Sequence, residues 1–272
     1  MAPSKSPVVY LVGAGPGDPE LLTRRGERLL RQATIVFYDA LVDERLLELL
    51  PPTVERCFVG KRARRAATTQ QRIVSLMIDA ARAGHRVVRL KCGDPCVLGR
   101  GGEEAEALRA AGIDCQIVPG VSAAIAAAEQ FGIPVTHRGL SSGVLTISGH
   151  AAAVYEPVLR ALPPRSVTVV VLMGQRNCRA ICQTLIGSGW PSDTPFARCA
   201  GAYTERARIW QTTLGQAALV DGPPLDDQPV TLVVGDVVGL RREHVESLLE
   251  LDQAAIAAPD ASLWDERRWE VL

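Results

Sequence analysis

The sequence predicts an α/β protein of two lobes, with a mainly parallel, Rossmann-like sheet in the N-terminal lobe and a mixed α/β C-terminal lobe. Short apolar runs alternate with helix-compatible stretches through the first half, and glycine-rich turns follow several of these runs. Residues 132–143, which contain Pro134 and have glycines at both ends, interrupt this rhythm before a second series of apolar runs begins. The interruption predicts a division between two lobes near residue 135.

The first half gives five expected strands and five expected helices in alternation. The strands are residues 8–12, 35–38, 54–59, 87–90 and 116–118, and the helices are residues 20–31, 44–50, 69–83, 101–112 and 122–130. Pro51 and Pro52 end the second helix, and Gly84 ends the third. Because a helix separates each strand from the next, all strands can run in one direction, which predicts a parallel sheet.

The second half is expected to contain strands at residues 144–147, 167–173 and 230–234 and a helix at residues 177–186. Residues 207–212 alternate polar and apolar side chains, as a half-buried strand does. We therefore divide the chain into a flexible N-terminal tail (1–8), an N-terminal α/β domain (9–135), a C-terminal α/β domain (136–242) and an acidic helix or tail (243–272).

The composition is that of a globular protein, and the charge is unevenly distributed. The 272 residues are 47% hydrophobic, and Lys+Arg and Asp+Glu both number 30, so the net charge gives no argument for nucleic acid or membrane binding. Between residues 56 and 100, however, eleven Lys or Arg residues face only two acids, Asp79 and Asp94. This segment either forms solvated helix faces and a loop or attracts a polyanionic small molecule.

The cysteine and histidine pattern argues against a metal site. Seven cysteines include no C-x-x-C pair, and the four histidines are scattered. Cys178 and Cys182 are four residues apart on an expected helix, which predicts one packed face. No secretory leader is visible, and no apolar run reaches the roughly 18 residues that a membrane span needs, so a cytoplasmic protein is expected.

Residues 91–104, KCGDPCVLGRGGEE, lie between an expected strand and an expected helix. Ligands of open α/β sheets bind at the carboxyl ends of the strands. In such a site Gly93 lets a ligand approach the backbone, Asp94 offers a carboxylate, Pro95 stiffens the turn and Arg100 can bind an anion. A simple turn that joins two elements is the alternative.

The turn after the first expected strand permits a second class of enzyme. A glycine-rich turn followed by an acid, Asp39, at the end of the second strand is also how a nicotinamide-binding fold begins. Here the glycines follow the order G-x-G-x-G instead of G-x-G-x-x-G, and Pro16 removes a backbone donor that a pyrophosphate would need. Both differences disfavour the nicotinamide-dependent oxidoreductase.

Several strings in a fixed order resemble one family. They are VYLVGAGPGDPELLT (9–23), VFYDALV (36–42), VGKR (59–62), GDP-x-V-x-GRGGEE (93–104), VPGVSAA (118–124) and GIPVTHRG (132–139). Together they resemble the tetrapyrrole methylases, most closely the branch that C-methylates uroporphyrinogen III, and the likeness is dense over residues 9–139. The resemblance implies the two-lobe fold of that family, S-adenosylmethionine as methyl donor, S-adenosylhomocysteine as product, a tetrapyrrole substrate and a homodimer.

The resemblance also assigns roles to single residues. The cofactor-binding positions are Pro16, Cys92, Gly93, Asp94, Val97, Ser122, Ala123, Met173, Gly201 and Ala202. Asp39 falls at the proton-acceptor position and Lys61 at the proton-donor position, with Glu103 close to the substrate ring. Arg100 and Arg138 would bind substrate carboxylates, for which the arginine fork is suited. Taken alone, Asp39 also suits a structural carboxylate and Met173 a core methionine.

The implied reaction is methylation of uroporphyrinogen III at C2 and C7, giving precorrin-1 and then precorrin-2 for sirohaem or cobalamin synthesis. The chain departs from the family pattern at Cys92, Cys96 and Leu98, where a glycine and two aromatic residues are usual, in the stretch after Lys61, and near residues 200–205. These departures leave open a methylase of another tetrapyrrole, or a paralogue that binds tetrapyrrole without catalysis.

Overall fold

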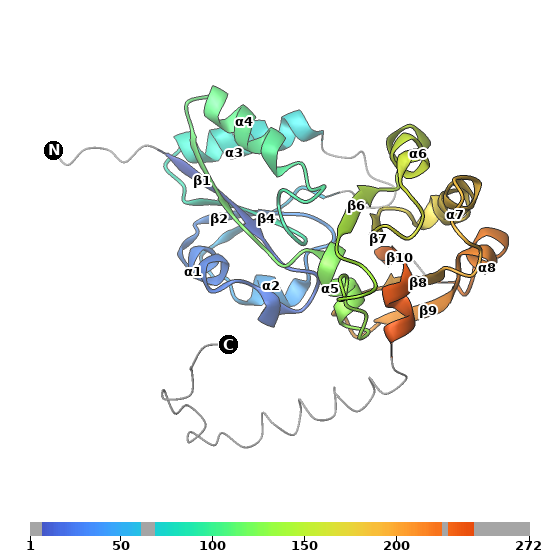
Figure 1. Cartoon of the computed structure of the whole chain (residues 1–272). Coiled ribbons are helices and arrows are strands. Elements are labelled where there is room, and N and C mark those ends of the chain that lie inside the picture. Colours follow the sequence, from blue (N-terminus) through green and yellow to red (C-terminus); the bar gives the residue numbers. More distant parts are fainter. Residues whose placement is uncertain (1–6, 61–68, 225–227, 242–272) are drawn as a thin grey trace, which may run out of the picture.

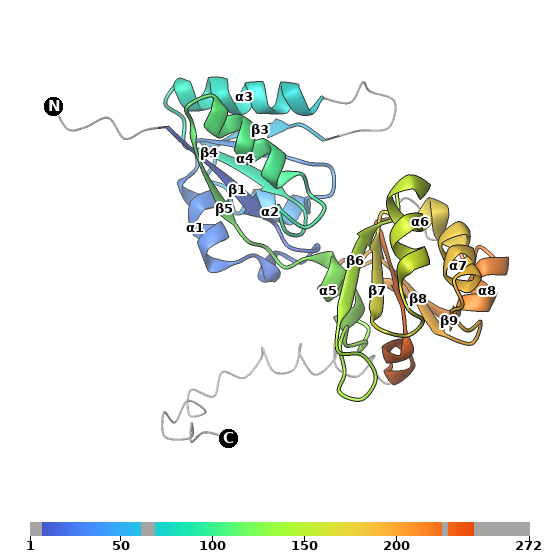
Figure 2. The same cartoon turned by 45° about the horizontal axis from the view of Figure 1, so that its top comes forward.

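The computed structural model describes residues 7–60, 69–224 and 228–241 (Figure 1). Within these residues the chain forms two five-stranded sheets, each in its own lobe, and α5 (Ala123–Glu129) lies between them (Figure 2). The predicted α/β fold with two lobes is confirmed. The predicted acidic segment 243–272 and residues 1–6 of the predicted tail lie outside the described residues.

The first sheet has the strand order β3-β2-β4-β1-β5. Its strands are β1 (Val8–Gly13), β2 (Ile35–Tyr38), β3 (Glu55–Phe58), β4 (Val87–Lys91) and β5 (Asp114–Val118). Every pairing is parallel, as the alternation of strands and helices predicted. Helices cover both faces of the sheet, so β1 is a nearly continuous apolar run, whereas β4 carries two buried cations, Arg89 and Lys91, among its apolar residues.

Four helices form the layers above and below this sheet. They are α1 (Arg24–Gln32), α2 (Glu44–Glu48), α3 (Gln70–Arg82) and α4 (Gly101–Ala110). The first two pack on one face and the last two on the other (Figure 1). The helix expected at residues 20–31 begins only at Arg24, because Pro19–Leu21 forms a separate 3-10 turn, η1, and the Thr23 hydroxyl caps α1 by accepting from the Gly26 N–H.

The second sheet is mixed, as predicted, with the strand order β6-β7-β10-β8-β9. Its strands are β6 (Val144–Ser148), β7 (Thr168–Leu172), β8 (Pro195–Ala200), β9 (Arg208–Thr213) and β10 (Val230–Val234). Only β6 and β7 are parallel; the other three pairings are antiparallel. The second sheet thus combines parallel and antiparallel pairings, whereas every pairing in the first sheet is parallel.

Helices α6 (Ala152–Ala161), α7 (Cys178–Gly187) and α8 (Leu214–Leu219) cover one face of the second sheet (Figure 2). Cys178 and Cys182 are buried on the packed face of α7, which confirms the prediction for this pair. A short 3-10 turn, η2 (Gln175–Asn177), precedes α7. The sequence did not reveal α6, which contains Pro157, nor β8 and α8, which are short and lack a strong periodic pattern.

The opposite face of the second sheet is covered by α5 and by the 3-10 helix η3 (Asp236–Leu240). Ala124 and Ala127 of α5 lie in one core with Val170 and Val233 of the sheet. Since α5 precedes residue 135, the chain reaches the second sheet before the predicted boundary. The division into domains at residues 135 and 136 stays a prediction, because packing alone does not test which segments fold independently.

Three glycines meet where β1, β4 and β5 end. A Cβ atom at Gly120 would lie 2.3 Å from the Gly93 carbonyl oxygen and 2.7 Å from the Gly13 Cα, and one at Gly13 would lie 2.5 Å from the Gly120 nitrogen. These neighbours are backbone atoms, which cannot turn aside as a side chain does. Only glycine therefore allows the three strand ends to approach so closely.

We expect Gly120→Ala to lower the free energy of unfolding by about 1–3 kcal/mol, because the added methyl group overlaps the backbone at Gly93. Urea denaturation followed by circular dichroism measures this change. Gly187→Ala is the control: a Cβ atom at this exposed glycine of α7 would have nothing within 4 Å, so alanine should stabilise the helix slightly. Equal midpoints for the two variants would contradict the steric argument.

Candidate active site

A cleft of about 650 Å³ lies between the two lobes. Its first-lobe wall comes from residues within 39–41, Gly60 and 91–99, which follow β2, β3 and β4, and its second-lobe wall from residues within 172–176 and 228–231. Ser122 and Ala123, where α5 begins, lie between the walls. The cleft thus occupies the carboxyl ends of parallel strands, the place that the sequence predicted for a ligand.

The turn after β4 is held by backbone and carboxylate hydrogen bonds. Gly93, whose φ is +66°, donates its N–H to the Gly15 carbonyl at 2.7 Å and accepts from the Gly15 N–H at 3.3 Å. The Asp94 carboxylate accepts from the backbone N–H of Cys96 at 2.8 Å and of Gly120 at 3.1 Å. Asp94 therefore joins the loops after β4 and β5 and fixes the floor of the cleft.

Apolar side chains on strained backbone form much of the cleft wall. Leu98 and Met173 line the cleft from opposite lobes, and both have positive φ, 54° and 57°. Such left-handed conformations are costly for residues other than glycine and persist where the surroundings fix them. Met173 is 52% exposed, so the alternative of a core methionine is wrong.

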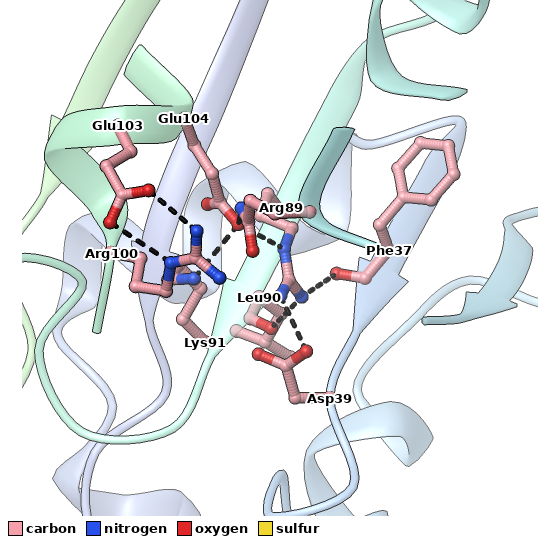
Figure 3. A network of polar contacts seen from close by, with 9 residues as sticks. Phe37, Asp39, Arg89, Leu90, Lys91, Arg100, Glu103 and Glu104 are labelled. Carbon is pink, nitrogen blue, oxygen red and sulfur yellow. Dashed lines mark hydrogen bonds and ion pairs between the residues drawn. The ribbon is translucent and has the colours of Figure 1, made fainter. Parts of the chain in front are cut away.

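A network of buried charges extends from the first-lobe wall into the protein (Figure 3). Arg89 of β4 donates to Asp39 Oδ1 at 2.6 Å and lies 3.4 Å from Glu104 Oε1 of α4. Lys91 Nζ lies 3.1 Å from the same Glu104 oxygen, to which Gln70 of α3 also donates at 2.7 Å. Two cations and two carboxylates thus compensate one another, and the network ends at the cleft in Asp39 and Lys91.

The burial of this network determines how strongly it constrains the site. The Glu104 side chain is fully buried, and those of Arg89 and Lys91 are 2% and 7% exposed, whereas that of Asp39 is 29% exposed. Desolvation of buried ions is expensive, so such a network contributes little net stability, but removing one partner leaves an uncompensated charge. The network therefore fixes the orientation of the Asp39 carboxylate toward the cleft.

Burial also shifts the pKa values of two groups in the cleft wall, the Lys91 ammonium and the Cys92 thiol. Desolvation lowers the pKa of the Lys91 ammonium, the neighbouring Arg89 charge lowers it further, and Glu104 opposes both effects. Burial raises the pKa of the Cys92 thiol to about 11, and the Asp39 charge contributes to the same shift. Cys92 is therefore a protonated, inert thiol at neutral pH.

The cleft brings together most of the predicted site residues. Those that line it are Asp39, Cys92, Gly93, Asp94, Val97, Ser122, Ala123 and Met173. Pro16 is buried in the turn after β1, next to Gly17, where an added Cβ atom would lie 2.9 Å from the carbonyl oxygens of Ala202 and Tyr203. Pro16, Gly201 and Ala202 therefore lie where the turn after β1 contacts the loop after β8, and they do not line the cleft.

The predicted substrate-binding residues do not line the cleft itself. Arg100 pairs with Glu103 at 2.7 Å, and both side chains are more than half exposed (Figure 3). Arg100 lines a hollow of about 500 Å³ that shares Asp39, Lys91 and Leu98 with the cleft, and both residues line another hollow beside α3. Arg138 is exposed in the turn that joins His137 to Ser141 and does not line the cleft. Lys61, the predicted proton donor, lies outside the described residues.

Sequence reasoning missed the residues behind the cleft wall, Arg89 and Glu104, and a role for Lys91. A signal was present, because Arg89 and Lys91 alternate with apolar residues in a strand that helices cover on both faces. Charged residues in such a strand must have buried partners. Glu104, the second acid of GRGGEE, is that partner for both cations.

We expect Glu104→Gln to lower the free energy of unfolding by about 3–5 kcal/mol, because the buried Lys91 would lose its carboxylate partner and Arg89 would be left with Asp39. Glu103→Gln is the matched control, since it removes the neighbouring but exposed carboxylate and should leave the unfolding midpoint almost unchanged. Chemical denaturation measures both variants. A loss in Glu104→Gln no larger than that in Glu103→Gln would show that the network is not coupled to the fold.

The two thiols of the cleft turn should react differently with iodoacetamide. Cys96 is exposed and is expected to be labelled first at pH 8, while Cys92 reacts slowly because its pKa of about 11 keeps it protonated. Between pH 8 and pH 10 the Cys92 rate should rise about tenfold per pH unit with the thiolate fraction. Peptide mass spectrometry measures both rates, and a Cys92 rate that is independent of pH would contradict this picture.

None of the helices described by the structure is long and apolar enough to cross a membrane.

Comparison with known proteins identifies the family. Residues 8–218 match the family of Tetrapyrrole (Corrin/Porphyrin) Methylases. Siroheme synthase from Psychrobacter sp. (strain PRwf-1) is 44% identical over 255 residues, which cover 92% of this chain and 52% of that protein. Siroheme synthase from Pseudomonas fluorescens (strain SBW25) is 43% identical over 236 residues, which cover 86% and 51%. The chain thus spans about half the length of these relatives.

Solved structures of single methyltransferases match nearly over their full length. Uroporphyrin-III C-methyl transferase from Thermus thermophilus, in complex with S-adenosylhomocysteine, is 41% identical, with a TM-score of 0.73 over 85% of this chain and 99% of that chain. The cobalamin biosynthetic enzyme cobalt precorrin-4 methyltransferase is 29% identical, with a TM-score of 0.74 over 85% and 95%. Since the family match covers the first sheet and four strands of the second, and the fold agrees with it, this chain belongs to the tetrapyrrole (corrin/porphyrin) methylases.

Proposed function

We propose that the protein transfers methyl groups from S-adenosylmethionine to C2 and C7 of uroporphyrinogen III, giving precorrin-1 and then precorrin-2. The observation that carries this proposal is the cleft between the lobes, which gathers eight of the residues that the family resemblance assigns to donor binding and catalysis. The Thermus thermophilus transferase, which binds S-adenosylhomocysteine, matches the chain over both lobes that build the cleft. The siroheme synthases support the same substrate class.

The residues of the cleft fit the methyl donor. S-adenosylmethionine carries an adenosine with a flat aromatic ring, a sulfonium and a single amino-acid end, so it suits a site with apolar walls, exposed backbone for hydrogen bonds and few charges. Val97, Leu98 and Met173 provide apolar surface, and Gly93 and Ala123 present backbone. The volume of about 650 Å³ also lies within the range of small-molecule sites, roughly 300–1,000 Å³.

Methyl transfer requires the alignment of donor and substrate more than it requires an activated nucleophile from the protein. When bound, S-adenosylmethionine supplies an electrophilic methyl group, which the electron-rich pyrrole carbon attacks directly. The two walls of the cleft align donor and substrate and exclude water. Asp39, held in place by Arg89, accepts the proton that the ring loses after methylation, and Lys61 donates a proton where charge develops.

The substrate carries eight carboxylates, for which Arg100 and Arg138 are the proposed partners. Arg100 already binds a carboxylate, that of Glu103, through two hydrogen bonds of 3.0 and 2.7 Å. A substrate carboxylate can replace Glu103 in this exposed pair at little cost, because exposed ion pairs contribute little stability. The proposal also includes a homodimer, which rests on the family resemblance, and a cytoplasmic location, which rests on the unpaired cysteines.

The second candidate is methylation of a different tetrapyrrole. It is favoured by the similarity to a cobalt precorrin-4 methyltransferase and by Leu98, which lines the cleft where the family usually has an aromatic residue. Both candidates use the same donor and the same cleft. A nicotinamide-dependent oxidoreductase has no comparable support, since the chain belongs to a methylase family.

Anaerobic incubation with methyl-labelled S-adenosylmethionine and enzymatically generated uroporphyrinogen III tests the proposal. We expect a product heavier by two methyl groups with the absorbance of precorrin-2, read by mass spectrometry and spectroscopy. Methyl transfer to a later precorrin but not to uroporphyrinogen III would favour the second candidate. Donor binding without transfer to either would indicate a binding paralogue.

We expect Asp39→Asn to lower kcat by about 10²–10⁴-fold, because the amide cannot accept the ring proton, while S-adenosylhomocysteine still binds. Asp193→Asn is the control, since this exposed acid of the second lobe pairs only with Arg165 among the described residues. Stopped-flow product formation and calorimetric titration separate the two effects. Normal turnover by Asp39→Asn would remove Asp39 from the proposed chemistry.

A further inference from the structure

A second hollow, of about 450 Å³, opens beside the cleft in the second lobe. We call it the arginine pocket; its walls include Arg176, Arg179, Arg198, Asp221 and Gln228. Among the described residues of its walls, three arginines outnumber one acid, so this part of the hollow is electropositive. Arg176 and Gln228 also line the cleft, which makes the two hollows neighbours with a common wall.

Arg198 is the unusual residue of this pocket. It lies on β8 in the interior of the sheet and is 5% exposed. Its Nη1 donates to the Asp221 carbonyl oxygen, and its guanidinium lies 5.4 Å from the centroid of Trp210. Its Nε is buried and has no partner, and no ion pair joins Arg198 to a carboxylate in the part of the chain that the structure describes.

Asp221, the acid among the described residues that line the pocket, does not neutralise Arg198. The Asp221 side chain is 81% exposed and pairs with Arg179 at 3.6 Å. A cation–π contact and one carbonyl group compensate a buried guanidinium only partly. Arg89, which is as deeply buried, shows the contrast, because it contacts two carboxylates. Arg198 therefore retains an unsatisfied capacity for an anion at the edge of the cleft.

Gln228 belongs to the wall that the pocket shares with the cleft. Its side-chain oxygen is buried without a hydrogen-bond partner and lies against Gly201, where an added Cβ atom would overlap it. The Gln228 oxygen therefore faces the loop after β8, whereas Arg198 and the neighbouring arginines point to a ligand in the pocket.

We propose that the arginine pocket is a subsite for a carboxylate of a ligand bound in the cleft, with Arg198 as its principal donor. The identity of the ligand rests on the proposed function, under which two sources carry this group. One is the amino-acid end of the methyl donor, and the other is an acidic side chain of the tetrapyrrole. Both present a planar carboxylate, which the guanidinium of Arg198 can bind where it lines the pocket.

Arg198→Met tests the subsite, because methionine keeps the buried stem and removes the charge. The probes are S-adenosylhomocysteine, 5′-methylthioadenosine, which lacks the carboxylate, and uroporphyrin III, an unreactive oxidised tetrapyrrole; titration calorimetry and fluorescence measure the Kd values. We expect Arg198→Met to weaken one carboxylate ligand by about tenfold or more while 5′-methylthioadenosine is unaffected. Arg208→Met, at an exposed arginine of β9, is the matched control.

The ligand whose affinity falls shows whether the methyl donor or the tetrapyrrole supplies the carboxylate. A raised Kd for S-adenosylhomocysteine alone assigns the pocket to the donor, and a raised Kd for uroporphyrin III alone assigns it to the substrate. Unchanged Kd values for both, with wild-type methyl transfer intact, would overturn the subsite. Absence of wild-type methyl transfer would instead overturn the proposed function, so the two failures can be told apart.

Thermal unfolding without ligand separates a binding role from a structural one. Removing an uncompensated buried cation should leave Tm unchanged or raise it. A large fall in Tm together with unchanged ligand affinities would mean that Arg198 serves the fold, and would contradict the proposal. If Arg198→Met does not fold, Arg198→Lys provides the second variant: it keeps the charge but loses the planar fork, so a weaker Kd supports the subsite and an unchanged Kd opposes it.

Discussion

The burial of the Glu104 carboxylate constrains the first lobe more than any other interaction. Gln70, Lys91 and Arg89 all direct nitrogen atoms toward one oxygen of this carboxylate, Oε1, while Oε2 is buried without a hydrogen-bond partner among the described residues. These donors belong to α3 and β4, while Glu104 itself belongs to α4. Helices α3 and α4 therefore have to keep a fixed position on the sheet. Because Arg89 also binds Asp39, the same contacts fix the position of Asp39 at the cleft.

The buried arginines of the two lobes differ in their carboxylate partners. In the first lobe Arg89 is compensated by Glu104 and Asp39, so its charge is used within the protein to position a side chain. In the second lobe Arg198 has no such carboxylate partner among the described residues and lies next to a hollow that borders the cleft. A buried arginine with carboxylate partners fixes the positions of the side chains around it, whereas one without such a partner favours the binding of an anion. The cleft lies between these two environments.

Local patterns predicted the first sheet well, because its strands are short segments bounded by turns and separated from one another by helices, and β1, β2 and β4 are rich in apolar residues. They failed for β8, whose sequence PFARCA has no β-branched residue and gains its strand conformation from pairing with β10 and β9. The site was predicted where motifs are contiguous, as around Gly93. The Arg89–Glu104 pairing was not predicted, since residues that are distant in sequence become partners only after folding.

The cleft wall is prepared for a ligand before one binds. Left-handed residues such as Leu98 and Met173 each cost roughly 1–2 kcal/mol, and exposed apolar surface adds a further cost in water. Hydrogen bonds keep the first-lobe wall in this conformation. Gly93 and Gly15 bond to each other, and the Asp94 carboxylate accepts from backbone N–H groups in the loops after β4 and β5. Because the rigid frame has already ordered these side chains, a ligand that covers them loses less affinity to ordering. Methyl transfer benefits most from such preorganisation, since the reaction depends on the alignment of donor and acceptor.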